Sequence, residues 1–211
     1  MIKVVTLNRT LNEARASPSD YRTPQVEALR RFTVTTPIDV PILNSPSARL
    51  PCAVECGWFD DVEAAAAAYG CASVAEFLAP GSAERWAARE NVVVPGSGQA
   101  FPDGAVKLVA FLKRRPEFSV DAFQRYWREN HAPLVPRTPR LRRYVQSHLL
   151  PEHYAVGEPL TDGLAELWWD SPDDFQISWA SPQIQQEQVA DSARFLGAGP
   201  FGGMGAEIVL R

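Results

Sequence analysis

The chain of 211 residues is short of lysine, because only Lys3, Lys107 and Lys113 are lysines among its 21 basic residues. Its 25 acidic residues outnumber the basic ones and give a formal net charge of −4. Proteins that bind nucleic acid as their main partner usually carry a basic surface instead. We therefore expect no nucleic-acid partner.

Long apolar runs are also absent. No segment approaches the roughly 20 apolar residues that a membrane-spanning helix requires. The opening "MIKVVTLNRT" has no long apolar core and no small-residue cleavage site, so it does not resemble a secretory signal. The sequence predicts a cytoplasmic protein with no membrane partner.

Cysteine and histidine are few and scattered. The three cysteines, Cys52, Cys56 and Cys71, are an odd number in the first half, which is not the pattern of a disulfide framework and suits a reducing compartment. Cys52 and Cys56 have a CxxxC spacing, but no nearby histidine or third cysteine completes a metal site. The three histidines also lack metal-ligand spacing. We expect small buried cysteines and no metal.

A faint internal repeat runs through the chain. "IKVVTL" (2–7) resembles "VKLVAF" (106–111), "AVECGWFDDVEAA" (53–65) resembles "LAELWWDSPDDFQ" (164–176), and "VAEFLAPG" (74–81) resembles "SARFLGAG" (192–199). The segments keep one order and nearly one spacing, and the stretch 94–105 between them is rich in Pro and Gly. The repeat predicts two halves, 1–97 and 98–211, with Glu55 opposite Glu166 and Trp58 opposite Trp169.

The second half has the clearer pattern of elements. Strands are expected at 106–113, 141–150, 163–170 and 206–210, and helices at 119–132, with Ser119 as N-cap, and within 172–196, where Pro182 divides the helix. This β-α-β-β-α-β order is that of a ferredoxin-like unit. The first half repeats it less clearly, with a helix expected near 24–32 and then "TVTTPIDVPILNSP", whose prolines disfavour a strand.

A sheet of this kind has helices on one face only, so its other face must be covered. The sheet of the other half has the same exposed face, so the two sheets can cover each other. The sequence therefore predicts an α+β fold of two fused ferredoxin-like halves, whose antiparallel sheets face each other as an α+β barrel with a cleft inside.

Several segments resemble the EthD family of dimeric α+β barrels. They are "VKLVAFLKRRPEFSVDAFQRYWRENHAPLV", "YVQSH", "DGLAELWWDSPDDF" and "ADSARFL", all within 105–210. The first half resembles a diverged copy, in which "LRRFTVTTPI" stands where "WRENHAPLV" would fall, so the histidine block occurs once. The resemblance implies small-molecule chemistry, mostly without metal or organic cofactor, by dehydratases, decarboxylases, isomerases or cofactor-free oxygenases. A fold alone does not select among these reactions.

The histidine of that block ends an amphipathic helix. Phe123, Trp127 and His131 are four residues apart and share one face. Pro133 is expected to stop the helix and to leave His131 at its C-terminus. The helix dipole there favours imidazolium, whereas burial favours the neutral ring. A histidine between these effects can exchange a proton near neutral pH. The alternative is that His131 only caps carbonyl groups at the helix end.

Two strands carry polar residues on alternate positions. Side chains two apart point to the same face of a strand, so we expect the apolar faces to pack on the helices and the polar faces to line the barrel cleft. The polar set is Tyr144, Gln146, His148, Glu166 and Trp168, and the repeat adds Glu55 from the opposite sheet. Aromatic walls with a few polar groups are typical of a small-molecule site. The alternative is that these polar groups satisfy one another.

Together with the resemblance, which implies work without a cofactor on aromatic-catabolism or polyketide-like compounds, this set predicts an acid–base enzyme of isomerase or lyase type that acts on such a small oxygenated compound. Glu166 or His131 would transfer the proton. The other expected site residues are the oxyanion donors His148 and Tyr144 and the substrate-contacting Trp127, Gln146, Trp168 and Glu55. Alternatives are a cofactor-free monooxygenase of phenols and a non-catalytic binding protein. Open sheet edges also favour a homodimer of the fused chain.

Overall fold

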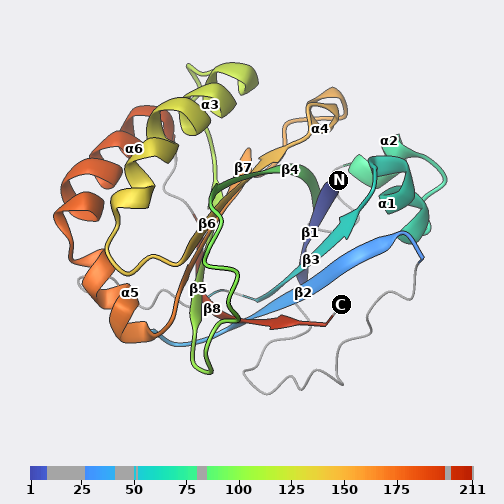
Figure 1. Cartoon of the computed structure of the whole chain (residues 1–211). Helices are drawn as coiled ribbons and strands as arrows, with labels where there is room; N and C mark the ends of the chain where they lie inside the picture. The colour runs from blue at the N-terminus through green and yellow to red at the C-terminus, as the bar shows by residue number, and fades with distance from the viewer. Residues whose placement is uncertain (9–26, 41–49, 51, 80–84, 198–200, 211) are drawn as a thin grey trace.

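The computed structural model describes residues 1–8, 27–40, 50, 52–79, 85–197 and 201–210. Eight antiparallel strands close into a barrel in the order β1-β3-β2-β8-β5-β7-β6-β4 (Figure 1). The strands are β1 (Ile2–Asn8), β2 (Leu29–Pro37), β3 (Ala53–Phe59), β4 (Arg85–Val94), β5 (Val106–Leu112), β6 (Arg143–Leu149), β7 (Gly163–Trp169) and β8 (Phe201–Val209). The expected α+β barrel is confirmed.

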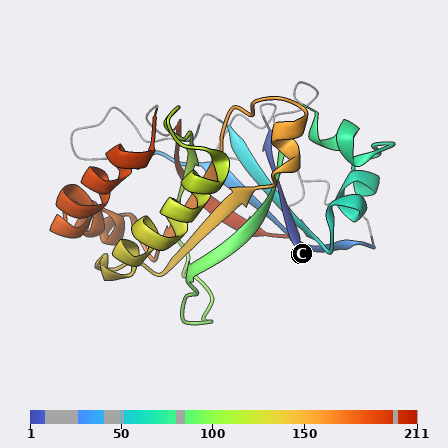
Figure 2. The ribbon, with the colours of Figure 1, turned by 90° about the horizontal axis from the view of Figure 1, so that it is seen from above.

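Helices pack outside the barrel at two opposite sides (Figures 1 and 2). On one side are α1 (Val62–Ala68) and α2 (Val74–Leu78). On the other side lies α3 (Val120–Tyr126), which is continued by the π-helical turn η2 (Trp127–His131) and the 3₁₀ helix η3 (Ala132–Arg137). The same side has α5 (Pro172–Trp179), followed by the π-helical turn η4 (Gln183–Gln188) and α6 (Val189–Phe195). The short α4 (Glu152–Ala155) lies between β6 and β7. No helix among the described residues has the length and apolar character of a membrane span.

The sequence explains where the helices of the second half begin and divide. Ser119 caps α3 as expected, because its hydroxyl accepts a hydrogen bond from the Ala122 amide at 3.2 Å. Ser171 caps α5 in the same way at Asp174. The helix expected within 172–196 is divided near Pro182, also as expected. These caps fix the entry of both helices onto the second half's sheet.

Each half contributes four strands in the same relative order. If the strands of each half are numbered one to four along the chain, their order in the sheet is four, one, three, two. This order is β4-β1-β3-β2 in the first half and β8-β5-β7-β6 in the second. The pairs β2–β8 and β4–β6 then join the halves and close the barrel. Closure leaves no unpaired sheet edge in the barrel.

The helix expected near 24–32 is wrong over residues 29–32, which begin β2, and residues 24–26 lie outside the described part of the chain. Residues Thr33 to Thr36 are β-branched and favour a strand, and Pro37 stands only at the end of β2, where a proline is tolerated. "LRRFTVTTPI" therefore forms a barrel strand, with the place in its half that β6 has in the other. It does not take the place of the histidine block.

The expected repeat is out of register by one residue between β3 and β7. Lys3 pairs with Trp58 across β1 and β3, and Lys107 pairs with Trp168 across β5 and β7. Trp58 therefore corresponds to Trp168, and Cys56 corresponds to Glu166. A shift of one residue reverses which face a side chain occupies.

Glu55 consequently does not look into the barrel as expected. It alternates with Cys56 and Trp58, and it shares its face with Ala53 and Phe59, which belong to the core packed against α1 and α2. Cys52 and Cys56 are buried free thiols, which confirms the expectation of small buried residues.

Inside the barrel, one end is ionic and the other apolar. Lys3 and Lys107 are both 1% exposed, and both pair with Glu166. Lys3 also pairs with Glu90 at 3.2 Å and Lys107 with Glu207 at 2.6 Å. These five residues are the barrel ion network. Because Lys3 and Glu90 come from one half and the others from the second half, the network links the halves.

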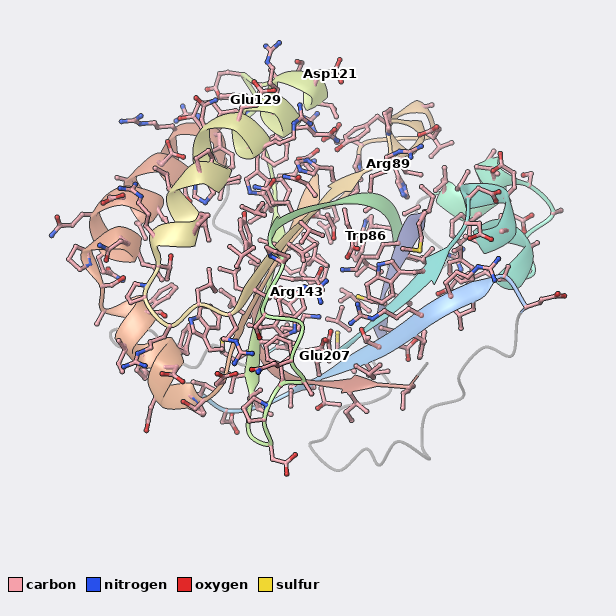
Figure 3. All side chains as sticks on the ribbon, viewed as in Figure 1. Trp86, Arg89, Asp121, Glu129, Arg143 and Glu207 are labelled. Atoms are coloured by element: carbon pink, nitrogen blue, oxygen red, sulfur yellow. The ribbon has the colours of Figure 1, made fainter. Side chains whose placement is uncertain are left out.

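Two tryptophans frame the network with the same partners in each half. The indole N–H of Trp58 donates to Glu90 at 2.9 Å, and that of Trp168 donates to Glu207 at 3.2 Å. Arg31 lies over the Trp58 ring and Arg143 over the Trp168 ring. Arg143 and Glu207 point toward the middle of the molecule in Figure 3. The repeat is thus visible in side-chain contacts, although the first half has a cysteine, Cys56, at the position that corresponds to Glu166.

Candidate functional site

A cavity of about 280 Å³ lies on the outer face of the second half's sheet, between that sheet and the helices from α3 to α6. Most of its wall is aliphatic or aromatic. The lining residues are Leu108, Ala110, Leu112, Trp127, His131, Val135, Tyr144, Ala165, Leu167, Trp169, Trp179, Ile184, Gln188, Val189, Ser192, Phe195 and Leu196. Apolar pockets with a few polar groups are the usual form of small-molecule sites.

The helices over the cavity each contain a π turn. Trp127 and His131 lie in η2, and Ile184 and Gln188 lie in η4. π turns are rare and are frequently found at functional sites, because the wider turn displaces side chains from their α-helical positions. The cavity-lining residues of both helices therefore come from locally widened backbone.

Pro133 does not end the helix as expected. Ala132 keeps a helical conformation at φ −54° and ψ −40°, and the chain continues as η3, with Pro133 in its first turn. Proline is compatible with a first helical turn, where its missing N–H has no partner to lose. His131 therefore lies within a continuous helical segment whose type changes around it.

His131 is held by a carboxylate on the neighbouring helix. Its Nδ1 lies 2.9 Å from Oδ2 of Asp191 in α6, and the Tyr126 hydroxyl donates to Oδ1 of the same carboxylate at 2.8 Å. Asp191 accepts the Nδ1–H of the neutral ring, so Nε2 carries the lone pair. Among the described residues, the ring of His131 hydrogen-bonds to Asp191 and not to a helix carbonyl, so the structure does not show the capping alternative.

Burial lowers the pKa of His131, and the hydrogen bond and charge of Asp191 offset this only in part. The net shift is downward from the ordinary value of 6.5, so the ring is neutral at pH 7. A neutral imidazole of fixed tautomer, beside an apolar cavity, can accept a proton at Nε2. Asp191 would then stabilise the imidazolium.

Tyr144 also lines this cavity. Its oxygen accepts hydrogen bonds from Trp127 Nε1 at 3.1 Å and from Gln146 Nε2 at 3.0 Å. Its own hydrogen therefore has no acceptor among the hydrogen bonds of the described residues. Burial raises the pKa of Tyr144, which keeps it protonated. Tyr144 is thus a donor available to an oxygen atom of a ligand.

Tyr144, Gln146 and His148 face the helices, and the expectation that they line the barrel interior is wrong. Gln146 pairs with Ala165 across β6 and β7, whereas Val145 pairs with Glu166, so the two polar sets point to opposite faces of the sheet. Alternation correctly predicts which side chains share a face within each strand. It does not give the register between β6 and β7, which also depends on the geometry of the connection between them.

Gln146 and His148 contact Trp127 from strand β6. Gln146 Nε2 donates to the Trp127 carbonyl at 3.0 Å, and its Oε1 accepts from Asn91 at 2.8 Å. The His148 ring lies 4.6 Å from the Trp127 ring, and burial lowers the pKa of His148 to about 4. Neither Gln146 nor His148 lines the cavity.

Glu166 and Trp168 face the barrel interior as expected, on the opposite side of the sheet from the cavity. Burial raises the pKa of Glu166, but Lys107 and Lys3 outweigh burial and bring it to about 2. A carboxylate that stays ionised between two lysines does not exchange protons near neutral pH. The structure therefore separates Glu166 and Trp168 from His131, Tyr144 and Trp127, which it brings together.

Asp191 is the site residue that sequence reasoning missed. It stands three residues after Gln188 and four before Phe195, and both of those residues line the cavity. An acidic residue on the apolar face of a helix is unusual unless it is paired. That pattern was the available signal. No cluster of three or more metal-ligating His, Cys, Asp or Glu side chains occurs in the described part of the chain.

Residues 115–199 match the EthD domain, and this stretch includes His131, Tyr144 and Asp191. The chain is similar to an ethyl tert-butyl ether d (EthD) family protein from Bacillus halodurans at 24% identity, with 49% of this chain and 99% of that chain covered and a TM-score of 0.42. No curated protein matches the chain.

Two further solved structures resemble nearly the whole chain. An anthrone oxidase-like protein is 13% identical over 99% of this chain and 93% of that chain, with a TM-score of 0.59. A proposed monooxygenase from Fusobacterium nucleatum is 8% identical over 100% of this chain and 92% of that chain, with a TM-score of 0.55. At these identities the likeness shows a shared fold.

Proposed function

We propose that this chain, which carries an EthD domain over residues 115–199, is an enzyme that transfers a proton on a small, largely apolar molecule without a cofactor. The observation that carries the proposal is the buried His131–Asp191 pair at an apolar cavity. Enzyme sites commonly hold a neutral histidine in one tautomer by a carboxylate on its second nitrogen. The cavity, and not the barrel interior, is the proposed site.

In the proposed reaction His131 Nε2 removes a proton next to a carbonyl group or from a phenol. Tyr144 donates a hydrogen bond to the oxygen that becomes negative, and Asp191 stabilises the imidazolium. The proton then returns at another carbon, which is an isomerisation, or a leaving group departs, which is a lyase reaction. A positioned general base contributes typically about 10²–10⁴-fold to the rate.

A second candidate is a cofactor-free monooxygenase that begins with the same proton transfer. The similarity of fold to an anthrone oxidase-like protein and to a proposed monooxygenase favours it. After His131 deprotonates a phenol, the electron-rich ring would react with O₂ to form a ring hydroperoxide. This would lose water, so that the substrate gains one oxygen atom, gives up two hydrogen atoms and becomes a quinone. His131 and Tyr144 keep their roles in both reactions.

The proposal extends to the organisation of the chain. We take residues 1–97 and 98–211 as two ferredoxin-like halves, supported by the same strand order in each. The proposed catalytic residues His131, Tyr144 and Asp191 all lie in the second half. The first half would serve to cover the barrel face of the second half's sheet.

The test is turnover of a panel of ring-cleavage acids and mono- to tricyclic phenols, followed by mass spectrometry with and without O₂. Conversion without O₂, at unchanged mass or with loss of water or CO₂, supports the isomerase or lyase reaction. Conversion that requires O₂ and adds oxygen supports the second candidate. If His131→Gln converts any substrate as fast as the wild type does, His131 is not the base and the proposal is wrong.

A further inference from the structure

The floor of the cavity is two adjacent alanines. Ala110 of β5 and Ala165 of β7 are direct partners across the sheet, and both line the cavity. On one side of them stand Leu108 and Leu167, which are also direct partners. Partner side chains on one face lie about 5 Å apart, so two methyl groups in a row of leucines leave a flat depression.

The first half has no such floor at the corresponding positions. The repeat that aligns Lys3 with Lys107 and Trp58 with Trp168 aligns Thr6 with Ala110 and Glu55 with Ala165. Thr6 and Glu55 are also direct partners, across β1 and β3. The same place in the fold therefore carries larger, polar side chains in one half and two alanines in the other.

Aromatic rings line the cavity on both the helix side and the sheet side. Trp127, Trp179 and Phe195 come from the helices, and Trp169 comes from β7. Trp127 packs down onto the start of β7, because a Cβ atom at Gly163 would lie only 2.6 Å from its ring. Rings prefer offset or edge contacts with other rings, so these walls suit a planar ligand.

Among the described residues, the lining contains no Lys, Arg, Asp or Glu. Its ionisable groups are His131, which is neutral at pH 7, and Tyr144, which stays protonated. A carboxylate or phosphate in the cavity would be buried without an opposite charge, which is strongly unfavourable. The two polar groups can instead serve one neutral hydroxyl or carbonyl oxygen.

We propose that the cavity binds an uncharged planar compound of fused rings with one oxygen between His131 and Tyr144, and that Ala110 and Ala165 determine the ring size that fits. This inference rests on the proposed function for the placement of the oxygen. The ring lies on the two alanines, under the tryptophans. This ligand class excludes the ring-cleavage acids of the substrate panel given above.

The first arm of the test compares the affinity of the full-length protein for 2-naphthol and for 2-naphthoate by calorimetry at pH 7. The two probes share one ring system and differ in charge. We expect 2-naphthol to bind at least about tenfold tighter, which corresponds to about 1.4 kcal/mol. Equal binding, or tighter binding of the carboxylate, would overturn the uncharged ligand class.

The second arm places larger side chains on the floor with Ala110→Val and Ala165→Val, and it measures the affinities for 2-naphthol and for phenol in parallel. We expect the affinity for 2-naphthol to fall about tenfold and that for phenol to change less than about threefold, because overpacking affects the larger ring. Ala206→Val on β8, outside the lining, is the matched control, and Ala165→Ser tests the site without added bulk. An equal loss for both probes, or no loss for either, would contradict the role of the floor.

Binding and turnover separate this inference from the proposed function. If 2-naphthol binds to the wild type more tightly than 2-naphthoate does, the ligand class stands whether or not any phenol is converted. If turnover depends on His131 but the carboxylates bind best, the proton-transfer proposal stands and the ligand class is wrong.

Discussion

At the residue scale, the partners of the histidines decide what each can do. His131 has a carboxylate on Nδ1 and an apolar cavity beside it. His148 has Gln146 on Nε2 and a buried Nδ1 that has no hydrogen-bond partner among the described residues. The sequence identified both as candidates from their positions on a helix face and a strand face. It did not reveal their partners, because Asp191 is 60 residues away from His131.

Removing the proposed base should lower the turnover rate, and removing its carboxylate partner should shift the pH dependence of turnover. We expect His131→Gln to lower kcat by about 10²–10⁴-fold. Asp191→Asn should move the acidic limb of the kcat/KM profile to lower pH, because the carboxylate raises the pKa of His131. Asp121→Asn is the matched control, since Asp121 and Glu129 point away from the barrel on the outer side of the helix (Figure 3). An unshifted profile in Asp191→Asn would contradict the pairing.

The buried histidines should make stability depend on pH. Burial lowers the pKa values of His148 and His153 from 6.5 to about 4, and the neutral His153 Nε2 accepts a hydrogen bond from the Ala87 amide. Because the unfolded chain binds protons first, the stabilisation is full above pH 6.5 and is lost as the pH falls toward 4.

Urea unfolding between pH 7 and pH 4.5 measures this effect. We expect the free energy of unfolding to fall over this range by a few kcal/mol, on the order of 1.4 per pH unit for each histidine. His148→Gln should be less stable than the wild type at pH 7 but should show a shallower slope. An identical slope in His148→Gln would mean that His148 does not titrate as described.

At the element scale, the second half was predictable and the connections between elements were not. The expected strands at 106–113, 141–150 and 163–170 match β5, β6 and β7 closely, because alternation and turn residues are local signals. The expected strand at 206–210 is the end of β8, which begins at Phe201. Helix type was also missed, since nothing in "WRENHAPLV" distinguishes a π turn from an α turn.

The faces of the strands show the same division. Within β6, Tyr144 and Gln146 do share a face, and within β7 so do Glu166 and Trp168. The two polar faces point to opposite sides of the sheet, because the residues that stand opposite each other depend on packing and on the connection 150–162, which contains α4. Of the eight expected site residues, Tyr144, Trp127 and His131 line the proposed cavity. Gln146 and His148 lie behind Trp127, and Glu166, Trp168 and Glu55 face elsewhere.

A substitution at Gly163, the first residue of β7, tests how closely this strand packs against Trp127 in the cavity wall. A Cβ there would meet the Trp127 ring at 2.6 Å and the Ser147 carbonyl at 3.1 Å. We expect Gly163→Ala to displace Trp127, to cost about 1–3 kcal/mol of stability and to weaken 2-naphthol binding. Gly57→Ala is the comparison, because its Cβ would meet only side-chain atoms of Phe59 and Leu29, at 3.1 and 3.2 Å. Intact binding in Gly163→Ala would contradict this packing.

At the scale of the whole molecule, the two halves are joined by two strand pairs and by the barrel ion network. The internal repeat predicted the barrel, because two sheets of this kind must cover each other's open face. The network was not predictable, since Lys3 and Glu166 are 163 residues apart and their pairing depends on barrel closure. It accounts for two of the three lysines in the chain.

Glu166 should therefore stabilise the fold and take no part in turnover. Glu166→Gln keeps the shape but leaves Lys3 and Lys107 with one carboxylate each, which we expect to cost about 3–5 kcal/mol of unfolding free energy. Turnover measured well below the melting temperature should be unchanged. Asp60→Asn, which breaks an exposed pair with Arg30, should change stability little. Loss of kcat in folded Glu166→Gln would restore Glu166 as a catalytic residue.

The measurement that tests the central claim most directly needs no substrate. Nitrogen-15 NMR of the His131 ring, assigned by comparison with His131→Gln, reports its tautomer and its pKa. We predict a neutral ring at pH 7 with the proton on Nδ1 and a pKa below 6.5. An imidazolium at pH 7, or a neutral ring with the proton on Nε2, would contradict His131 as the base.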